Sequence, residues 1–364
     1  MSKPPSPLVS KIAGIILPFV VFGLLGYTWY VYIFRICTHI LLTFDKTAQA
    51  VIFMIIASFF WIMALLSYTR ILCTSPGKPA NRLATEEANQ GVHLPQYYYS
   101  PKLFHWPTYT MRPMMDAQDK ITPIISVSRQ DGQPKYCHMC ECYKPDRTHH
   151  CRECNTCVLK MDHHCPWVSG CVGFRNYKFF FLFVLYTGCY GLWVFVTSLP
   201  VVITGIQDMH TDLDPQWIAL IIIAFVFGMT VCGFSGVHAY YIIRNETTIE
   251  HLGDRNNELR VDFDMSGQNF EVVSVSPLDN LWERTKMENW KSVMGNHPLG
   301  WFVPIKRGPG DGTVFPYNDY MFNNIVNKAV SQRRSMDTSH YGQPTTYYEP
   351  ERLSSIESTT QMTS

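Results

Sequence analysis

Residues 137–171 read CHMCECYKPDRTHHCRECNTCVLKMDHHCPWVSGC and contain eight of the twelve cysteines and five of the thirteen histidines in the chain. Two sets of side chains in this stretch share the spacings 3, 10 and 7, with an offset of 14 residues between the sets. Three thiolates and one imidazole complete the tetrahedral shell of a structural Zn²⁺. The sequence therefore predicts two closed zinc sites, Cys137, Cys140, His150 and Cys157 for the first and Cys151, Cys154, His164 and Cys171 for the second.

The two sets overlap along the chain, because Cys157 of the first set follows Cys151 and Cys154 of the second. Both ions are therefore expected to hold one compact unit that has little other core. Zinc binding contributes about 10–16 kcal/mol to the folding of such a unit. We interpret the eight ligands as structural and assign no chemistry to them.

Cys165 belongs to neither set. It would begin a third repeat, but no cysteine follows at position 168 and no histidine ten positions later. Neighbouring His163 could lower the pKa of this thiol or take its proton, and Asp162 could fix the tautomer of His163. The first repeat has Thr148 in place of Asp162. We interpret Cys165 as a nucleophile, with an alternative zinc ligand as the competing interpretation.

Four long apolar stretches lie on either side of the cysteines. They are Ile12–Phe34, Ala50–Tyr68, Phe179–Gly205 and Trp217–Ile243, and the last contains His238 as its only acidic or basic side chain. About 20 apolar residues suffice to cross the hydrocarbon core of a bilayer. The sequence therefore predicts an α-helical multi-pass membrane protein with four transmembrane helices and a small two-zinc domain between the second and third.

The composition excludes several classes of protein. A net charge of +1 argues against binding nucleic acid by general phosphate neutralisation, and 47% hydrophobic with 16% charged residues argues against a disordered chain. Twelve cysteines in 364 residues are too dilute for a small disulfide-stapled secreted domain.

The basic residues predict the orientation in the membrane. By count, 14 Lys and Arg fall in residues 69–178 and 12 from Arg244 onward, whereas residues 206–216 contain three aspartates and no Lys or Arg. Because positively charged loops stay in the cytosol, we expect both termini and the zinc domain to be cytosolic. Because Cys171 holds the chain a few residues before the third span begins near Phe179, the thiol of Cys165 would then lie near the cytosolic membrane face.

The expected organisation has seven parts. They are a cytosolic N-terminus (1–11), transmembrane helices 1 and 2 (12–68), a cytosolic linker (69–134), the zinc domain (135–178), transmembrane helices 3 and 4 (179–243), a cytosolic C-terminal region (244–330) and a disordered tail (331–364). Within the C-terminal region, Leu278–Gly295 is predicted to form an amphipathic helix with Leu281, Trp282, Trp290 and Val293 as apolar contacts.

The Cys/His stretch resembles the DHHC cysteine-rich domain of protein S-acyltransferases (palmitoyltransferases). The resemblance rests on Lys-Pro-x-Arg before His149-His150-Cys151, on Asp162-His163-His164-Cys165-Pro166-Trp167, and on Cys171, Gly173 and Asn176. Thr247-Thr248-Ile249-Glu250 is similar to the Thr-Thr-x-Glu motif of the family, and Asn289-Trp290 through Met294-Gly295 to its C-terminal aromatic motif.

The resemblance implies an acyl transfer in two steps. Cys165 takes a long-chain acyl group, such as palmitoyl, from acyl-CoA, with His163 as base and Asp162 orienting it, and a cysteine of a cytosolic or membrane-anchored protein then receives the acyl group. His164 is implied as a zinc ligand, Thr248 as a neighbour of the catalytic Asp, and Asn289 as a supporting residue. Thr28 and Tyr190 fall where the closed end of the acyl tunnel would be. Similarity and charge make Lys135, Lys144, Arg147 and His149 candidates for binding the CoA phosphates, with a basic face near anionic lipids as the alternative.

Two departures from the family pattern concern local hydrogen bonds. Ser75-Pro76-Gly77 replaces Asp-Pro-Gly after the second span, and Ser169-Gly170 stands before Cys171, where an Asn is common. Golgi or ER membranes are the expected location, with the plasma membrane or vacuole as alternatives. A non-enzymatic membrane adaptor and a membrane-anchored RING-type ubiquitin ligase are the competing functions, and the spacing of 3, 10 and 7 together with the spare Cys165 argues against the ligase.

Overall fold

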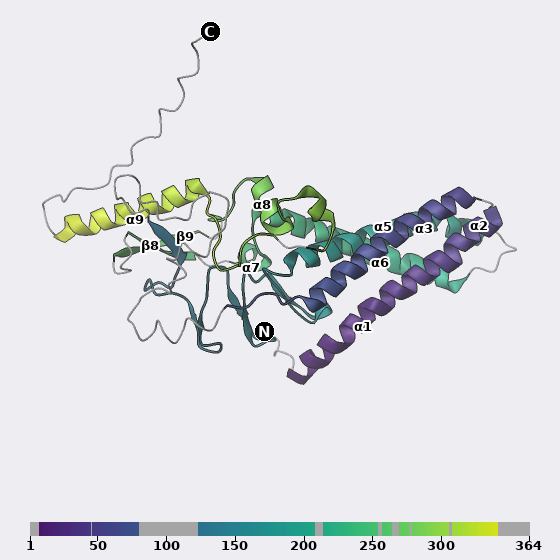
Figure 1. Ribbon diagram of the computed structural model, residues 1–364, viewed down its shortest axis with the longest axis horizontal. Coiled ribbons are helices and arrows are strands. Elements are labelled where there is room, and N and C mark those ends of the chain that lie inside the picture. The colour runs from purple at the N-terminus through teal and green to yellow at the C-terminus, as the bar shows by residue number, and fades with distance from the viewer. Residues whose placement is uncertain are drawn as a thin grey trace, which may run out of the picture.

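The computed structural model describes residues 7–44, 46–79, 123–207, 214–253, 257–263, 269–276, 279–305 and 308–340. Most of the expected linker and the end of the expected tail lie outside the described residues. Figure 1 shows an elongated arrangement, with a bundle of long helices at one end and a mixed part with the short strands at the other.

Four helical segments form the bundle. The first, Ile12–Ile40, combines α1 (Pro7–Val31), a π-helical turn (Tyr32–Cys37) and the start of α2 (Thr38–Phe44), and the others are α3 (Thr47–Cys73), α5 (Tyr177–Gln207) and α6 (Pro215–Arg244). Each segment is long and apolar enough to cross a membrane. The four predicted spans are thus confirmed, and each observed helix continues beyond its predicted apolar stretch.

Glycines allow α5 and α6 to approach closely. A Cβ at Gly191 would lie 2.7 Å from the Cα of Gly228, and a Cβ at Gly188 would lie 2.8 Å from the backbone of Cys232. Small residues permit this contact between backbones in membrane helices, where lipid provides little hydrophobic force for association. The close pairing of α5 with α6 therefore depends on the glycines at their contact.

Polar contacts fasten the bundle at the end far from the short strands. Arg35 pairs with Asp214 at 2.6 Å, and Asp214 also caps α6 by accepting from the backbone N–H of Gln216. Deeper in the bundle, the hydroxyls of Tyr32 and Thr197 lie 2.7 Å apart. These contacts join the first span to the third and fourth.

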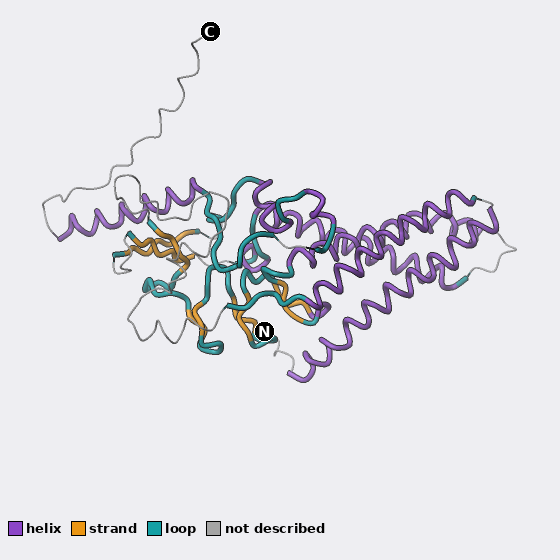
Figure 2. The backbone as a smooth tube through the Cα atoms, viewed as in Figure 1, coloured by secondary structure: helices purple, strands orange, loops and turns teal. Residues whose placement is uncertain are grey.

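The Cys/His-rich part consists of three short antiparallel hairpins. They are β2 (Tyr136–Cys137) with β3 (Cys142–Tyr143), β4 (His149–Cys151) with β5 (Thr156–Val158), and β6 (His163–Cys165) with β7 (Gly170–Val172). Figure 2 shows these strands between the helix bundle and a separate three-stranded sheet. The backbone of Ser75-Pro76-Gly77 supports the hairpins, because Pro76 O accepts from Arg175 N and Gly77 O from Leu159 N.

A second sheet pairs one strand from before the third membrane helix with two strands from after the fourth. Strand β1 (Ile124–Val127) precedes the hairpins, whereas β8 (Asn257–Asp262) and β9 (Phe270–Val275) follow α6, and the three pair antiparallel in the order β1-β8-β9. Helix α9 (Asp319–His340) packs Ile325 and Ala329 against the apolar side chains of this sheet. The short helix α7 (Thr248–His251), α8 (Lys286–Met294) and a 3₁₀ turn (Pro298–Phe302) complete the described elements of this part.

Two expectations for the C-terminal region need correction. The helix expected over Leu278–Gly295 begins only at Lys286, because Thr285 and Glu288 form a capping box there, and Trp282 packs before the helix instead of on it. The tail expected to be disordered from position 331 is helical to His340, because α9 continues past its packed half and Arg333 lies over the Phe263 ring.

The close helix contact generates a test. Gly191→Ala places a Cβ against the Gly228 backbone and should cost about 1–3 kcal/mol by overpacking. A thermal unfolding curve of the detergent-purified protein should show a lower Tm. Gly233→Ala, on α6 with nothing within 4 Å of the added Cβ, is the matched control and should not lower the Tm. Equal effects of the two substitutions would contradict the close packing.

Candidate functional site

Each predicted ligand set converges on one point. In the first cluster the sulfur atoms of Cys140, Cys137 and Cys157 lie 3.3, 3.5 and 3.9 Å from His150 Nδ1. In the second, those of Cys154, Cys151 and Cys171 lie 3.3, 3.6 and 3.8 Å from His164 Nδ1. Donors bound tetrahedrally to one zinc stand about 3.5 Å apart. The spacing and the donor types therefore fit one metal ion in each cluster, and all donors of a cluster lie within 4.8 Å of one another.

The period of 14 residues is also visible in the backbone. His150 pairs with Cys157 in the second hairpin, and His164 pairs with Cys171 in the third. Each turn contains one residue in the left-handed region, and these residues, Glu141, Asn155 and Ser169, are again 14 positions apart, with φ of 48°, 47° and 54°. The three hairpins are therefore repeats of one local structure.

Cys165 occupies the first ligand position of the third repeat. It pairs with Gly170, as Cys151 pairs with Thr156 and Cys137 with Cys142. The residue three positions later is Val168, which is buried and offers no donor. The backbone of Cys165 is therefore placed like that of a zinc ligand, but no ligand set surrounds its sulfur. Its partly buried side chain packs at the edge of an apolar cluster that includes residues of α3 and α5.

Asp162 and His163 lie beside this thiol. The Nδ1 of His163 and the Oδ2 of Asp162 are 2.6 Å apart, and the His163 side chain lies close enough to Cys165 for the thiol to affect its pKa. Burial favours the neutral imidazole, but the hydrogen bond with Asp162 and the nearby Cys165 thiol raise the pKa of His163 to about 9. With Nδ1 engaged by the carboxylate, Nε2 is the ring nitrogen left for the thiol. This arrangement can take a proton from Cys165 and hold the resulting imidazolium.

Thr248 supplies two further hydrogen bonds to Asp162. Its backbone N–H donates to Oδ1 at 3.0 Å, and its hydroxyl donates to Oδ2 at 2.8 Å. Burial alone would raise the pKa of Asp162, but the hydrogen bond from His163 and the N–H of Thr248 hold that pKa below its usual value. A capping box of Thr247 and Glu250 builds the turn that carries Thr248. Both carboxylate oxygens of Asp162 are thereby held, and Oδ2 is shared by His163 and the Thr248 hydroxyl.

The structure corrects the expectation that Arg147 binds a phosphate. Its side chain is 0% exposed and makes a two-pronged ion pair with Glu250, at 2.7 and 2.6 Å. The guanidinium also donates to the side chain and backbone oxygens of Asn245 and lies over the Trp282 ring. Arg147 therefore joins the hairpins to the segment after α6. Its donors are used internally, so they do not face a ligand.

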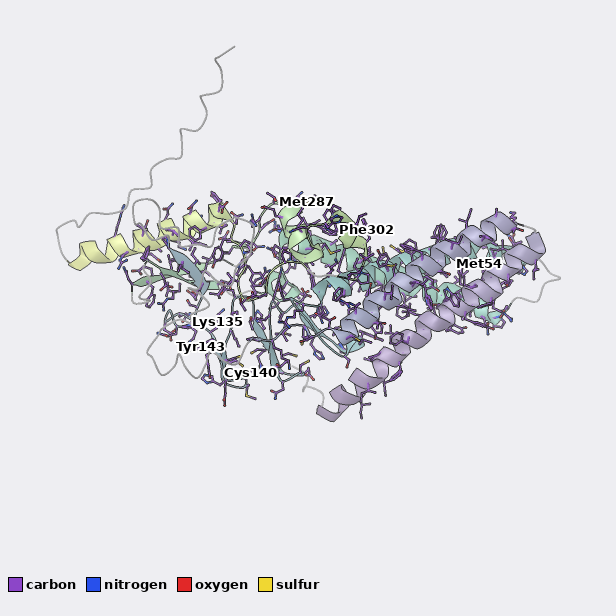
Figure 3. The ribbon with its side chains drawn as sticks, in the orientation of Figure 1. Met54, Lys135, Cys140, Tyr143, Met287 and Phe302 are labelled. Atoms are coloured by element: carbon purple, nitrogen blue, oxygen red, sulfur yellow. The ribbon has the colours of Figure 1, made fainter. Side chains whose placement is uncertain are left out.

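The other candidate phosphate ligands remain together. Lys144 N–H donates to Lys135 O at 2.7 Å, and the two side chains lie near enough to each other and to His149 for their charges to interact. Figure 3 labels Lys135 among the hairpins, away from the helix bundle. Three basic or imidazole groups thus gather on the hairpin side, without Arg147.

Inside the bundle, Thr28 of α1 and Tyr190 of α5 meet. The Tyr190 hydroxyl donates to Thr28 Oγ1 at 3.3 Å, and both side chains are buried. The predicted neighbours therefore form one hydrogen-bonded pair between two spans. Asn289 on α8 is also buried, and its amide donates to Ile243 O at the end of α6. Asn289 thereby fixes α8 against the fourth span.

Sequence reasoning missed Tyr177 and His238 at this site. The hydroxyl of Tyr177 and Nδ1 of His238 lie 2.9 Å apart, and the ring centroids of His238 and His163 lie 5.9 Å apart. Phe180 and Phe234 pack edge-on against the buried His238 ring. The available signal was that His238 is the only acidic or basic residue of the fourth span, since such residues in membrane helices commonly have a function. The sequence did not indicate which neighbour it contacts.

Four membrane helices with two Cys/His clusters between the second and third define an integral membrane protein with a domain whose clusters could hold two metal ions. The DHHC palmitoyltransferase family model matches residues 130–255. Palmitoyltransferase PFA3 of Debaryomyces hansenii is 30% identical over 76% of this chain and 75% of its own length. Palmitoyltransferase ZDHHC20 of Homo sapiens is 28% identical over 80% and 73%, and palmitoyltransferase ZDHHC15 of Rattus norvegicus is 29% identical over 80% and 78%. The chain belongs to the DHHC palmitoyltransferase family.

The clusters predict a metal content of about two zinc ions per chain, measurable by elemental analysis of purified protein. His150→Ala removes one of four donors from a closed site, so that variant should lose zinc and misfold. Cys165→Ser, outside both shells, should retain about two zinc ions. A folded His150→Ala protein with unchanged zinc content would contradict the ligand assignment.

Arg147 gives a test that separates a structural role from phosphate binding. Arg147→Met leaves the Glu250 carboxylate partly buried without its partner and should cost about 3–5 kcal/mol, seen as a strong loss of thermal stability. Arg152→Met, at an exposed position, is the control and should leave the Tm nearly unchanged. Unchanged stability of Arg147→Met with a raised KM for acyl-CoA would favour phosphate binding instead.

Proposed function

We propose that the protein is a protein S-acyltransferase that moves a long-chain acyl group, palmitoyl in the first instance, from acyl-CoA to cysteines of membrane-associated proteins. The observation that carries this proposal is a thiol outside both Cys/His clusters, Cys165, close to a His163 whose Nδ1 is held by Asp162. Membership of the DHHC palmitoyltransferase family and the names of the relatives support the same class of reaction.

In the first step, His163 Nε2 takes the proton of Cys165 as the sulfur attacks the thioester carbonyl of acyl-CoA. The carbon–sulfur bond to CoA breaks, and the proton on His163 passes to the departing CoA thiolate. One thioester replaces another, so the step needs no other energy source. Asp162 stabilises the transient imidazolium charge without taking the proton.

In the second step, the thiol of a substrate protein takes the place of CoA. Its proton passes to His163 as its sulfur attacks the acyl group on Cys165, and the Cys165 thiolate leaves and regains the proton. Because the nucleophile packs against the apolar cluster at the start of α5, substrate cysteines close to the membrane surface are favoured. Cysteines of membrane-anchored proteins meet this condition.

Zinc ions in the two clusters would be held by the eight Cys and His ligands and would supply structural organisation only, because each shell is complete. Lys135, Lys144 and His149 are the groups we propose for the CoA phosphates. The paired side chains of Thr28 and Tyr190 would limit the length of the acyl chain inside the bundle. We also propose that the hairpins and both termini face the cytosol, in a Golgi or ER membrane.

Label transfer from a radioactive long-chain acyl-CoA to detergent-purified protein tests the proposal. Wild type should acquire a label that hydroxylamine removes, because a thioester is cleaved by this reagent, and Cys165→Ser with a full zinc content should acquire none. Absence of label on folded, zinc-replete wild type would favour the membrane adaptor. Equal label on both proteins would place the acyl group on another residue.

The hydrogen bonds of Thr248 give a second test. Thr248→Val removes the hydroxyl donor to the buried carboxylate, and a hydrogen bond to a charged group contributes about 1.5–3 kcal/mol. The rate of acyl-enzyme formation should therefore fall about tenfold to a hundredfold, since 1.4 kcal/mol corresponds to a factor of about ten. Thr248→Ser keeps the donor and should restore most of the rate. A normal rate in Thr248→Val would show that Asp162 needs no orientation from this side.

A further inference from the structure

The segment that follows α8, as far as Ile305, exposes three large apolar side chains. Leu299 is 76% exposed, Phe302 62% and Ile305 62%. They belong to the 3₁₀ turn Pro298–Phe302 and the residues directly after it. Single exposed apolar residues are common on proteins, but three within seven positions require an explanation.

The backbone of the same segment is bound by side chains of the membrane helices. Lys178 of α5 donates to Gly300 O at 2.7 Å, and Tyr186 of α5 donates to Phe302 O at 2.6 Å. Arg70 of α3 donates to Ile305 O at 2.9 Å. Three carbonyls of an irregular segment are thus satisfied by side chains of two spans. Irregular backbone at membrane depth requires this kind of partner, because lipid offers no donor.

The position of Tyr186 gives the depth. It lies nine residues beyond Tyr177, the first residue of α5, which corresponds to about 13 Å along a helix that rises 1.5 Å per residue. The backbone at Phe302 lies within hydrogen-bond reach of this side chain. Figure 3 labels Phe302 beside the helix bundle, near Met287 of α8. The segment therefore lies alongside the start of the third span.

The two faces of the segment differ. Trp301 and Val303 pack against the apolar cluster that contains Phe179 and Phe181 of α5, and Trp301 also contacts Trp290 of α8. The side chains of Leu299, Phe302 and Ile305 point away from this cluster and are exposed. The inner face thus joins the segment to the bundle, and the outer face is apolar and exposed.

We propose that Pro298–Ile305 is a membrane-inserted anchor, whose outer face contacts the lipid acyl chains of the leaflet next to the Cys/His hairpins. The occupant of this face is lipid, because the segment is bonded to two membrane helices beside their own lipid-facing surface. An insertion of this kind, shallower than a span, resembles that of an interfacial segment. The anchor would hold α8, and through Asn289 the end of α6, close to the membrane surface. It does not depend on the role of Cys165.

Photocrosslinking in vesicles tests this proposal with the full-length protein. Leu299 or Phe302 is replaced by p-benzoylphenylalanine, and the protein is reconstituted in phosphatidylcholine vesicles and irradiated. Met139, 72% exposed between the first cysteines, and Tyr320, 75% exposed on α9, are matched controls for exposed side chains away from the spans. Each variant is first checked for the zinc content of the wild type, so that misfolded protein is not scored.

Mass spectrometry should find phosphatidylcholine attached at positions 299 and 302 at about tenfold or higher yield than at 139 and 320, as expected for side chains inserted among acyl chains. Equal lipid yields at all four positions would overturn the proposal. Crosslinks from 299 and 302 to protein in place of lipid would also overturn it, because the outer face would then be an interface between proteins.

Discussion

Convergence of three thiols and one imidazole at each of two points is the constraint on which the geometry of the candidate site depends. The hairpins are two or three residues per strand and have little apolar core of their own, so ligation is the main source of their order. His164, a ligand, lies between His163 and Cys165. Fixing the ligand therefore fixes the thiol and its neighbouring imidazole.

The third hairpin shows how a thiol without a ligand set arises in such a repeat. It has the turn and strand register of the two hairpins before it, but Val168 replaces the second cysteine. The sulfur of Cys165 is therefore presented like a ligand and remains outside any shell. Burial of Asp162 and its hydrogen bonds with His163 and Thr248 complete the arrangement. Contacts from the region after α6 are thus needed as well, and the Arg147–Glu250 ion pair fastens that region to the hairpins.

Spacing and apolar length were sufficient to predict the ligand sets, the spare thiol and the four spans, because these depend on local patterns. The role of Arg147 could not be predicted in this way. Its charge suggested a phosphate, whereas its partners, Glu250 and Asn245, are about 100 residues away and meet it only in the folded chain. The contact between Tyr177 and His238 could not be predicted for the same reason. The end of α9 was predicted to be disordered, because amino-acid composition does not indicate that Arg333 packs on the Phe263 ring.

The central claim is that Cys165 carries the acyl group while both metal shells remain intact. Native mass spectrometry of wild-type protein after incubation with palmitoyl-CoA tests it most directly, followed by peptide mapping of the modified cysteine. The account predicts molecules that hold two zinc ions and one acyl group together, with the acyl group on Cys165. Acylation confined to molecules that have lost zinc, or mapped to a cysteine of either shell, would contradict it.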